Sequence, residues 1–443
     1  MAQWWSFIGA LLLAAGCGRF GYELLPLKPD TSPGGPVNSV SVSPVPGSPV
    51  PGSPPPEDAG MGGRSAGVDA SAAVNPGDED AGSGAGSDAA PCQVLGAPAD
   101  WWDPRFGQRR RLVFNNSGQS QALDDFVVLV VLRADGATPF DYSHARPDGA
   151  DLRFVDDDGV TQLKHHVERW QPGGVSYLWV RVQRIDAAPA SDHIWLYHAN
   201  PMAPAVDDEP GTYAPDFGAV LHLGETSGAF RDSVRGIDCT WQPQAESARG
   251  APGAIGAAVT VANAAGVVCP NDMLLGMGDY TITAWVHPNA PDNSTAFGHI
   301  VVAEALAFPN PGPALILRTS DLALSTWYDG YLRSAARVTA NSWSMATLRV
   351  KVDGSSGVIE GRVNAGPWET LQSGDTTREG VVAGSPLTIG TWIGDAFPAY
   401  FRGDIDEVRV STVMRSDDYL AAEYLSQSDA LITQSPETAA FCQ

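Results

Sequence analysis

Two stretches near the end of the chain, Ser385-Pro-Leu-Thr-Ile-Gly-Thr-Trp-Ile-Gly and Tyr400-Phe-Arg-Gly-Asp-Ile-Asp-Glu-Val-Arg-Val-Ser, decide the fold class. In both, apolar side chains such as Leu387 and Ile389 alternate with polar residues or glycine, which is the period of a strand with one buried face. Upstream, similar segments follow one another between loops rich in Gly, Asp and Pro, without a helical period. This order predicts an all-β chain built from antiparallel β-sandwiches.

The two stretches closely resemble the last core strands of the laminin-G-like, concanavalin-type jelly roll. The same family resemblance extends upstream to Val220-Leu-His-Leu-Gly-Glu, to Phe230-Arg-Asp-Ser and to Gly278-Asp-Tyr-Thr-Ile-Thr-Ala-Trp-Val-His-Pro. It also includes a short closing helix with Ser416 as its expected N-cap. The resemblance covers residues 216–430 and implies a sandwich of a kind that binds glycans or proteins and seldom carries chemistry.

A second resemblance covers residues 99–203, which look like the bacterial module known as domain of unknown function 2341. The matching features include Asp148-Gly-Ala-Asp-Leu-Arg-Phe, Trp179-Val-Arg-Val and Trp195-Leu-Tyr-His-Ala-Asn-Pro. The family brings no known activity, and it often precedes laminin-G-like domains on surface proteins. The expected architecture is therefore two antiparallel β-sandwich (jelly-roll) domains, at 92–203 and 216–430, with an interdomain linker at 204–215 and a C-terminal tail at 431–443.

The beginning of the chain predicts export. Residues 1–16 contain the apolar run Phe7-Ile-Gly-Ala-Leu-Leu-Leu-Ala-Ala, which has signal-peptide length and is too short to span a bilayer as a helix. The run ends in Leu13-Ala-Ala-Gly-Cys, which resembles the lipobox of bacterial lipoproteins. That resemblance implies a lipidated Cys17 and a place in the bacterial cell envelope, at the outer membrane or cell surface. An ordinary secretory peptide or a buried apolar helix is the alternative.

Residues 17–91 predict a disordered linker. They have no hydrophobic periodicity and repeat Pro-Val-Pro-Gly-Ser before a tract of Gly, Ala, Ser and Asp. Such a composition buries too little apolar surface to offset the entropy cost of ordering. The net charge of −24 makes nucleic acid an unexpected partner, because phosphate binding needs a basic surface. Membrane attachment is expected only through the N-terminal lipid.

The chain has five cysteines, and four remain once Cys17 is assigned to lipid. An even number in an oxidising compartment indicates disulfides, and four cysteines allow three pairings. We favour Cys239 with Cys269, because both lie on early, neighbouring strands of the second sandwich. Cys92 and Cys442 would then join the start of the globular part to its end. The chain has no CxxC or Cys/His ligand spacing, so a structural zinc site is not expected.

The sequence favours noncatalytic binding of a polysaccharide or glycoprotein over catalysis. The candidate ligand-binding aromatics are Trp327, Tyr328, Trp392 and Tyr400, with Tyr331 as a further candidate, and core packing is the alternative for each. A structural or protein–protein adhesion module that contacts envelope proteins is the second hypothesis. A glycan hydrolase or lyase is the third and weakest, because the closing strand lacks the second alternating acid of related jelly-roll glycosidases.

No cofactor is required by this hypothesis, and calcium is the one ion that the family resemblance suggests. Asp232, Asp404 and Asp406 are the candidate ligands if they meet at one edge, and separate capping of turns is the alternative. Two histidine motifs, His165-His166 with Glu168 and His222 with Glu225, could suggest a metal site, but the sequence does not favour one at either. Successive strand residues point to opposite faces, and His222 is expected to be a strand residue beside a turn acid.

Overall fold

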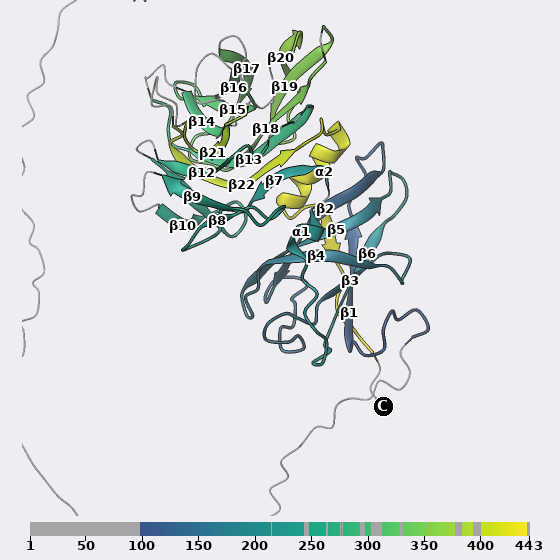
Figure 1. Ribbon diagram of the computed structural model, residues 1–443. Coiled ribbons are helices and arrows are strands. Elements are labelled where there is room, and N and C mark those ends of the chain that lie inside the picture. The colour runs from purple at the N-terminus through teal and green to yellow at the C-terminus, as the bar shows by residue number, and fades with distance from the viewer. Residues whose placement is uncertain are drawn as a thin grey trace, which may run out of the picture. The chain divides into compact units, whose positions relative to one another are not determined.

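The structure is a computed structural model (Figure 1). It describes residues 98–440, except 214, 243–247, 263–264, 275, 277, 293–296, 303–311, 328–330, 354, 377–382 and 393–399. The described residues belong to one compact unit, Gly86–Gln443. The expected signal peptide and linker, with Cys17, Cys92, Cys442 and Tyr328, lie outside the described residues.

The first sandwich is a continuous antiparallel path of strands in the order β2-β5-β4-β3-β6-β1-β23, with β24 also paired to β1. At its corner, β4 changes partners: Leu163 pairs with Phe154 of β3, and the next residue, Lys164, pairs with Arg181 of β5. The strands that precede the second sandwich are β1 (Gln108–Phe114), β2 (Leu123–Arg133), β3 (Arg153–Val155), β4 (Gln162–Arg169), β5 (Val175–Ile185) and β6 (His193–His198).

Strand β2 is apolar almost throughout because both of its faces are covered. One face lies in the core of the first sandwich, and helix α2 (Asp417–Gln427), from the end of the chain, packs against the strand as well. The rings of Phe126 and Tyr419 lie 5.0 Å apart, and Leu129 N donates to Ser426 Oγ at 2.8 Å. Strand β2 is therefore buried along most of its length.

The second sandwich consists of two antiparallel sheets. One sheet has the order β10-β11-β22-β13-β18-β19-β20, with β7 paired to β22, and the other has the order β17-β16-β15-β14-β21-β12-β9-β8. Their strands in chain order are β7 (Phe217–Leu221), β8 (Phe230–Arg231), β9 (Asp238–Gln242), β10 (Ala248–Pro252), β11 (Ala257–Val261), β12 (Gly266–Asn271), β13 (Tyr280–Pro288), β14 (Phe297–Val302), β15 (Ala314–Arg318), β16 (Ala323–Trp327), β17 (Tyr331–Arg337), β18 (Ser344–Lys351), β19 (Gly357–Val363), β20 (Glu369–Gly374), β21 (Pro386–Ile389) and β22 (Gly403–Ser411).

Strand β22 contains a β-bulge that breaks the expected alternation. Ile405 and Val408 both point into the core, although they are three residues apart. The register with β13 shifts at this point, and Glu407 has a positive φ of 47°. A bulge inserts one extra residue and turns the following side chains to the other face. Here it frees Glu407 from the core and presents it on the opposite side of the sheet.

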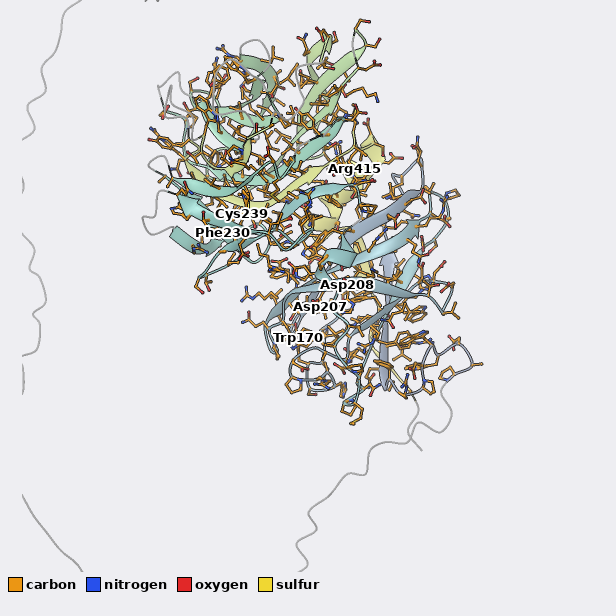
Figure 2. The ribbon with its side chains drawn as sticks, viewed as in Figure 1. Trp170, Asp207, Asp208, Phe230, Cys239 and Arg415 are labelled. Atoms are coloured by element: carbon orange, nitrogen blue, oxygen red, sulfur yellow. A yellow bond between two sulfur atoms is a disulfide. The ribbon has the colours of Figure 1, made fainter. Side chains whose placement is uncertain are left out.

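The predicted disulfide between Cys239 and Cys269 is present, and it joins the neighbouring strands β9 and β12 (Figure 2). Cys239 also pairs with Phe230 of β8. The bond therefore ties together the strands at one edge of the second sheet. The other expected pair, Cys92 with Cys442, stays a prediction.

The stretch from 431 onward differs from the expected tail. Strands β23 (Ile432–Gln434) and β24 (Thr438–Ala439) return to the first sandwich and pair with β1. The guanidinium of Arg110, which is almost fully buried, donates to Gln434 Oε1 at 2.8 Å and lies 3.0 Å from Glu437 Oε1. These strands are too short to show an alternating pattern.

The two helices are short. Ser416 caps α2 as predicted, since its Oγ accepts from Tyr419 N at 3.2 Å. Helix α1 (Glu209–Thr212) lies in the expected linker 204–215. In the part of the chain that the structure describes, neither helix has the length and apolarity that crossing a membrane requires.

Candidate functional site

The structure brings two of the predicted ligand-binding aromatics together. Trp327, at the end of β16, and Trp392, just after β21, both pack against one small apolar cluster. The cluster is separate from the main core of the second sandwich. Its strands alternate, so that Leu315 and Leu317 of β15 face the main core. The buried members of the cluster are Phe297, Val302, Ala314 and Ile316.

We call the surface formed by Phe297, Trp327, Tyr331, Arg333 and Trp392 the aromatic face. The register of β16 and β17 sets Trp327 opposite Tyr331, with ring centroids 4.7 Å apart. Tyr331 also stacks on Phe297 at 3.5 Å, and its side chain is 36% exposed. The guanidinium of Arg333 lies 5.9 Å from the Phe297 ring. Sequence reasoning named Tyr331 as a further candidate but missed Phe297 as a member of this surface.

Tyr400 lies next to this region but has a partner of its own. It forms an isolated bridge with Thr391, the residue before Trp392. Its hydroxyl accepts from Arg402 at 3.2 Å, and the same guanidinium lies 5.2 Å from its ring. Arg402 in turn contacts Asp292 at 2.5 Å. Of the four predicted aromatics, Trp327 and Trp392 therefore share a surface and Tyr400 adjoins it.

The three predicted calcium ligands do not meet. The buried carboxylate of Asp232 accepts from Val220 N at 2.9 Å and from Arg235 N at 3.0 Å, and so caps a turn. Asp406, also buried, accepts from Ile255 N at 2.8 Å and from Glu407 N at 2.9 Å. Burial raises the pKa of Asp232, and it raises that of Asp406 well above its ordinary value.

Asp404 has different partners from the other two aspartates. It accepts from Thr260 Oγ1 at 2.5 Å and lies 3.2 Å from His287 Nδ1. Within the described residues, no group of three clustered metal-ligand candidates contains Asp232, Asp404 or Asp406. The geometry supports the alternative reading, in which these carboxylates hold backbone and side-chain donors separately.

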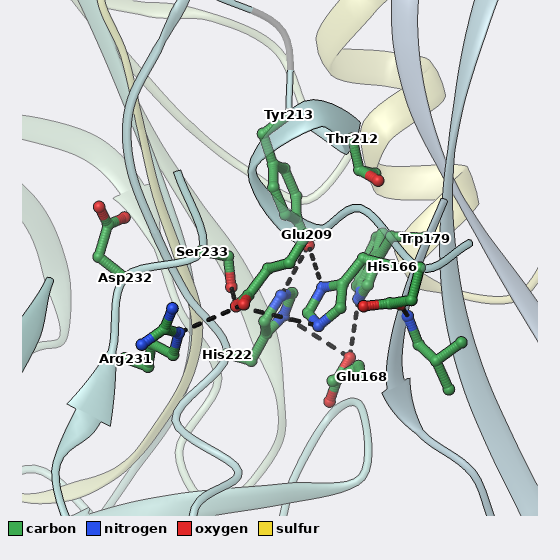
Figure 3. A network of polar contacts seen from close by, with 12 residues as sticks. His166, Glu168, Trp179, Glu209, Thr212, Tyr213, His222, Arg231, Asp232 and Ser233 are labelled. Atoms are coloured by element: carbon green, nitrogen blue, oxygen red, sulfur yellow. Dashed lines mark hydrogen bonds and ion pairs between the residues drawn. The ribbon is translucent and has the colours of Figure 1, made fainter. Parts of the chain in front are cut away.

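A second candidate site lies where the two sandwiches meet, and we call it the polar junction (Figure 3). It surrounds a cavity of 780 Å³ whose walls come from β4, α1, the segment after β7, β8 and the β10–β11 hairpin. The polar side chains in these walls are His166, Glu168, Arg169, Glu209, His222, Glu225, Thr226, Arg231 and Ser233.

His222 is the centre of the polar junction. Its Nε2 lies 2.7 Å from the Tyr213 hydroxyl. Its Nδ1 lies 2.7 Å from Glu407 Oε1 and 3.6 Å from Glu168 Oε2. Glu168 belongs to the first sandwich, Tyr213 to the linker, and His222 and Glu407 to the second sandwich. The bulge in β22 is what allows Glu407 to reach this position.

Trp179 and Arg409 support these side chains from behind. The indole N–H of Trp179 donates to Glu168 Oε2 at 2.7 Å, and its ring stacks on His222 with centroids 5.5 Å apart. Arg409 donates to Glu407 Oε2 at 3.0 Å and lies 4.1 Å from the Trp179 ring. The carboxylates and the imidazole are therefore held in fixed orientations before any ligand arrives.

The buried position of the polar junction changes its protonation. Burial raises the pKa of Glu168 to about 7 and lowers that of His166 to about 3. Burial by itself would lower the pKa of His222, but Glu407 and Glu168 raise it above its ordinary value. Burial also opposes ionisation of Glu407, yet His222 and Arg409 hold its pKa below the usual value. A charged pair of His222 and Glu407 is thereby favoured.

The rim of the cavity is formed by a smaller network. Ser233 Oγ donates to Glu209 Oε1 at 2.8 Å, and Arg231 Nε donates to Glu209 Oε2 at 3.3 Å. Glu225 Oε1 accepts from Arg231 N at 2.7 Å. His166 Nε2 lies 3.9 Å from Glu209 Oε1. Acidic, basic and imidazole groups thus alternate around one opening.

Sequence reasoning named His166, Glu168, His222 and Glu225 but did not bring the two motifs together. The expected alternation in β4 is present: His165 packs on Phe154 in the first core, with centroids 5.2 Å apart, while His166 and Glu168 face the cavity. The sequence did not show which residues pack against His166 and Glu168, because His222 and Glu407 belong to the other sandwich. The only sequence signal was the spacing of two between His166 and Glu168, which places both on one face.

Two family models match the chain. One, described as a domain of unknown function (DUF2341), covers residues 148–241, and the other, the concanavalin A-like lectin/glucanases superfamily, covers residues 261–421. The chain therefore carries a DUF2341 segment followed by a concanavalin A-like domain, and the predicted all-β fold class is confirmed. At the polar junction, Glu168 and His222 lie in the first match and Glu407 in the second.

Several solved structures are similar to parts of the chain. Domain 4 of AbnA, an extracellular arabinanase from Geobacillus stearothermophilus, was solved with arabinotriose; it is 19% identical over 46% of this chain and 97% of that domain, with a TM-score of 0.35. A Trypanosoma rangeli sialidase solved with sialic acid is 10% identical over 61% of this chain and 45% of its own, with a TM-score of 0.37. The chain thus spans less than half of that sialidase. No curated protein matches the chain.

Proposed function

We propose that this chain is a noncatalytic glycan-binding protein and that the aromatic face of its second sandwich holds the ligand. The observation that carries the proposal is the meeting of Trp327 and Trp392, distant in sequence, with Tyr331 on one surface. The concanavalin A-like lectin/glucanase fold of this domain is consistent with such a role.

The aromatic face has the two chemical properties that a sugar ring requires. Aromatic rings offer flat apolar surface against the C–H face of a pyranose or furanose, and Tyr also brings a hydroxyl. Arg333 adds guanidinium donors, which bind sugar hydroxyls or uronate carboxylates. Because Tyr331 stacks on Phe297 at 3.5 Å, its ring is held in place before binding, and less side-chain entropy is lost.

The closing strand supports the noncatalytic part of the proposal. Glycoside hydrolysis needs two carboxyl groups that flank the scissile bond. Asp406 is fully buried and accepts two backbone N–H groups, and Asp404 is held by Thr260 and His287. Asp404 and Asp406 therefore act as structural acceptors.

The proposal is tested by retention of the full-length chain on a panel of immobilised polysaccharides, including arabinans, uronic acid polymers and sialylated glycans. We expect saturable binding to at least one of them. Trp327→Ala and Tyr331→Ala should each weaken it at least tenfold, about 1.4 kcal/mol, by removing stacking area. Trp195→Ala is the matched control, because it removes a half-buried aromatic from the first sandwich and should leave binding unchanged.

The same panel distinguishes the competing functions. Release of soluble oligosaccharides from a bound polysaccharide would contradict a noncatalytic role and favour a hydrolase or lyase. Binding to no polysaccharide, together with specific retention of an envelope protein, would replace glycan binding by adhesion. Equal binding by the wild-type chain and the Tyr331→Ala variant would place the glycan elsewhere.

We also propose that lipid on Cys17 anchors the chain at the bacterial envelope, with residues 17–91 as the tether. The proposal rests on the sequence of the first residues, which lie outside the described part of the chain. Metabolic labelling with a fatty-acid analogue should mark the wild-type chain and not the Cys17→Ala variant. Equal labelling of both, or of neither, would contradict lipidation at this residue.

A further inference from the structure

We propose that Glu168, His222 and Glu407 at the polar junction form a binding site for a divalent transition-metal ion of the zinc class. One ligand atom from each of these three side chains lies within 4.8 Å of the others. The three come from β4, from the residue after β7 and from β22. The ion would therefore be coordinated by side chains from both sandwiches. The site is distinct from the aromatic face and does not depend on the proposed glycan function.

The distances are close to those of a coordination sphere. Zinc binds imidazole nitrogen and carboxylate oxygen at about 2.0–2.2 Å, so neighbouring ligand atoms in a tetrahedral site are about 3.3 Å apart. His222 Nδ1 lies 2.7 Å from Glu407 Oε1 and 3.6 Å from Glu168 Oε2. An ion therefore needs the distance between His222 Nδ1 and Glu407 Oε1 to increase by about 0.6 Å.

The supporting contacts fix each ligand as metal sites require. A ligating histidine uses its other ring nitrogen as a hydrogen-bond donor, and this contact sets both tautomer and ring orientation. With Nδ1 on the ion, His222 Nε2–H donates to the Tyr213 hydroxyl at 2.7 Å. Glu168 is held by the indole of Trp179 at 2.7 Å. Arg409 holds Glu407 through its other oxygen, Oε2, which leaves Oε1 directed at His222.

The cavity gives the ion an entry path and an open position. Glu168 and His222 both line it, whereas Glu407 is fully buried behind them. Three protein ligands with one position open to solvent is the arrangement of zinc sites that bind water or an exogenous ligand. His166 lies in the same wall, with its ring 5.4 Å from that of His222. An oxygen ligand that enters the cavity could therefore meet both the ion and this imidazole.

The donor set selects the class of ion. Calcium takes six to eight oxygen ligands, and an imidazole in a three-ligand site does not suit it. Imidazole combined with carboxylates suits zinc, cobalt and manganese. The other cluster of candidate ligands in the described residues, Asp157, Asp192 and His193, is less suited. Its His193 Nδ1 contacts Arg111 at 3.1 Å, and Asp192 already accepts two backbone N–H groups.

The test is calorimetric titration of the metal-free, full-length chain, without a histidine tag, with Zn²⁺, and with Co²⁺ followed by its visible absorption. We expect one ion per chain at this site and the spectrum of a low-coordinate Co²⁺ centre. Glu168→Gln keeps the shape of the side chain and removes a charged ligand. It should weaken binding at least tenfold, since even the loss of a supporting contact costs about 10–100-fold.

Two further variants keep the outcome decisive. His222→Gln should also abolish the Co²⁺ spectrum, while Asp157→Asn, in the other cluster, should leave both titrations unchanged. Absence of binding to the wild-type chain overturns the proposal and leaves the cluster as a buried ion pair. An affinity that is unchanged in Glu168→Gln, or binding that is lost in Asp157→Asn, overturns it as well. Circular dichroism of each variant shows that the fold is retained, and Glu168→Gln is decisive if His222→Gln unfolds.

Discussion

The aromatic face and the polar junction are assembled in opposite ways. The aromatic face comes largely from neighbouring strands of one sheet, where alternation alone carries Trp327 and Tyr331 to the same side. The polar junction takes Glu168 from one sandwich and His222 and Glu407 from the other, and it needs a bulge to aim Glu407. Local periodicity therefore predicts the first kind of surface, and only the packing of domains creates the second.

The aromatic face and the polar junction should differ most in their contribution to the free energy of unfolding. The largest effect is expected for replacement of Arg409. Its side chain is 2% exposed and lies 3.0 Å from Glu407 and 3.7 Å from Glu423. Arg409→Ala removes the guanidinium from beside both buried carboxylates, and removing one partner of a buried ion pair typically costs about 3–5 kcal/mol of unfolding free energy. Urea denaturation followed by fluorescence measures the loss.

The control for this prediction is Arg184→Ala, which breaks exposed pairs with Asp124 and Asp186. Exposed ion pairs contribute little, so the denaturation midpoint should hardly move. If Arg409→Ala behaves like Arg184→Ala, the polar junction does not hold the two sandwiches together.

The second sheet, which carries the aromatic face, relies on a covalent bond at its other edge. Replacing Cys239 and Cys269 together by Ala opens a loop with a sequence separation of 30, and the chain-entropy model gives about 3–4 kcal/mol for its loss. Thermal unfolding with and without reductant checks this. Wild-type chain that unfolds at the same temperature under reducing and oxidising conditions would contradict a stabilising disulfide.

His299, on β14 beside Trp392, predicts a pH effect within the aromatic region. Burial lowers its pKa to about 3, against about 6.5 in an unfolded chain. At pH values above the pKa of the unfolded chain, His299 is neutral in both states and does not make the free energy of unfolding depend on pH. As the pH falls below this pKa, the unfolded chain takes up a proton that the folded chain rejects, so stability falls by up to about 1.4 kcal/mol per pH unit.

The pH prediction is measured as a difference between two chains. The free energy of unfolding of the wild-type chain should fall more steeply between pH 6.5 and pH 4.5 than that of His299→Leu, because the variant has no group to titrate there. Parallel curves would show that His299 is accessible to protons in the folded chain.

The smallest effect is expected for Tyr331→Ala. The ring is 36% exposed and lies on an edge strand, so its loss should cost less than about 1 kcal/mol of unfolding free energy. A much larger destabilisation, seen as a fall of the denaturation midpoint towards that of Arg409→Ala, would show that the aromatic face is part of the structural core. Its role as a ligand surface would then lose its support.

Much of the second sandwich could be predicted because its signals are local. Tyr280 and Ile282 follow the two-residue period and lie on one face of β13, Ser416 caps α2, and Cys239 pairs with Cys269 on adjacent strands. The bulge at Glu407 could not be predicted, because an acid at that point of an alternating strand carries no mark of an extra residue. A prediction that assumes strict alternation along β22 therefore assigns every side chain after the bulge to the wrong face of the sheet.

The remaining differences also have long-range causes. Strands β23 and β24 span only a few residues and pair with β1, which lies more than 300 residues away, so no window of sequence contains both partners. The acids Asp232 and Asp406 were read as possible ligands of one ion, but each is used by nearby backbone N–H groups. A carboxylate can accept hydrogen bonds from backbone N–H groups or coordinate a metal ion. The neighbouring sequence does not distinguish these two roles.

The central claim is that the two regions are separate binding sites, and one crossed measurement tests it most directly. Affinity for a retained polysaccharide and for Zn²⁺ would be measured side by side in the wild-type chain, in Tyr331→Ala and in Glu168→Gln. The account predicts that Tyr331→Ala loses the polysaccharide at least tenfold and keeps the ion, while Glu168→Gln does the reverse. Loss of both ligands in either variant whose fold is intact, or of neither in both variants, would contradict it.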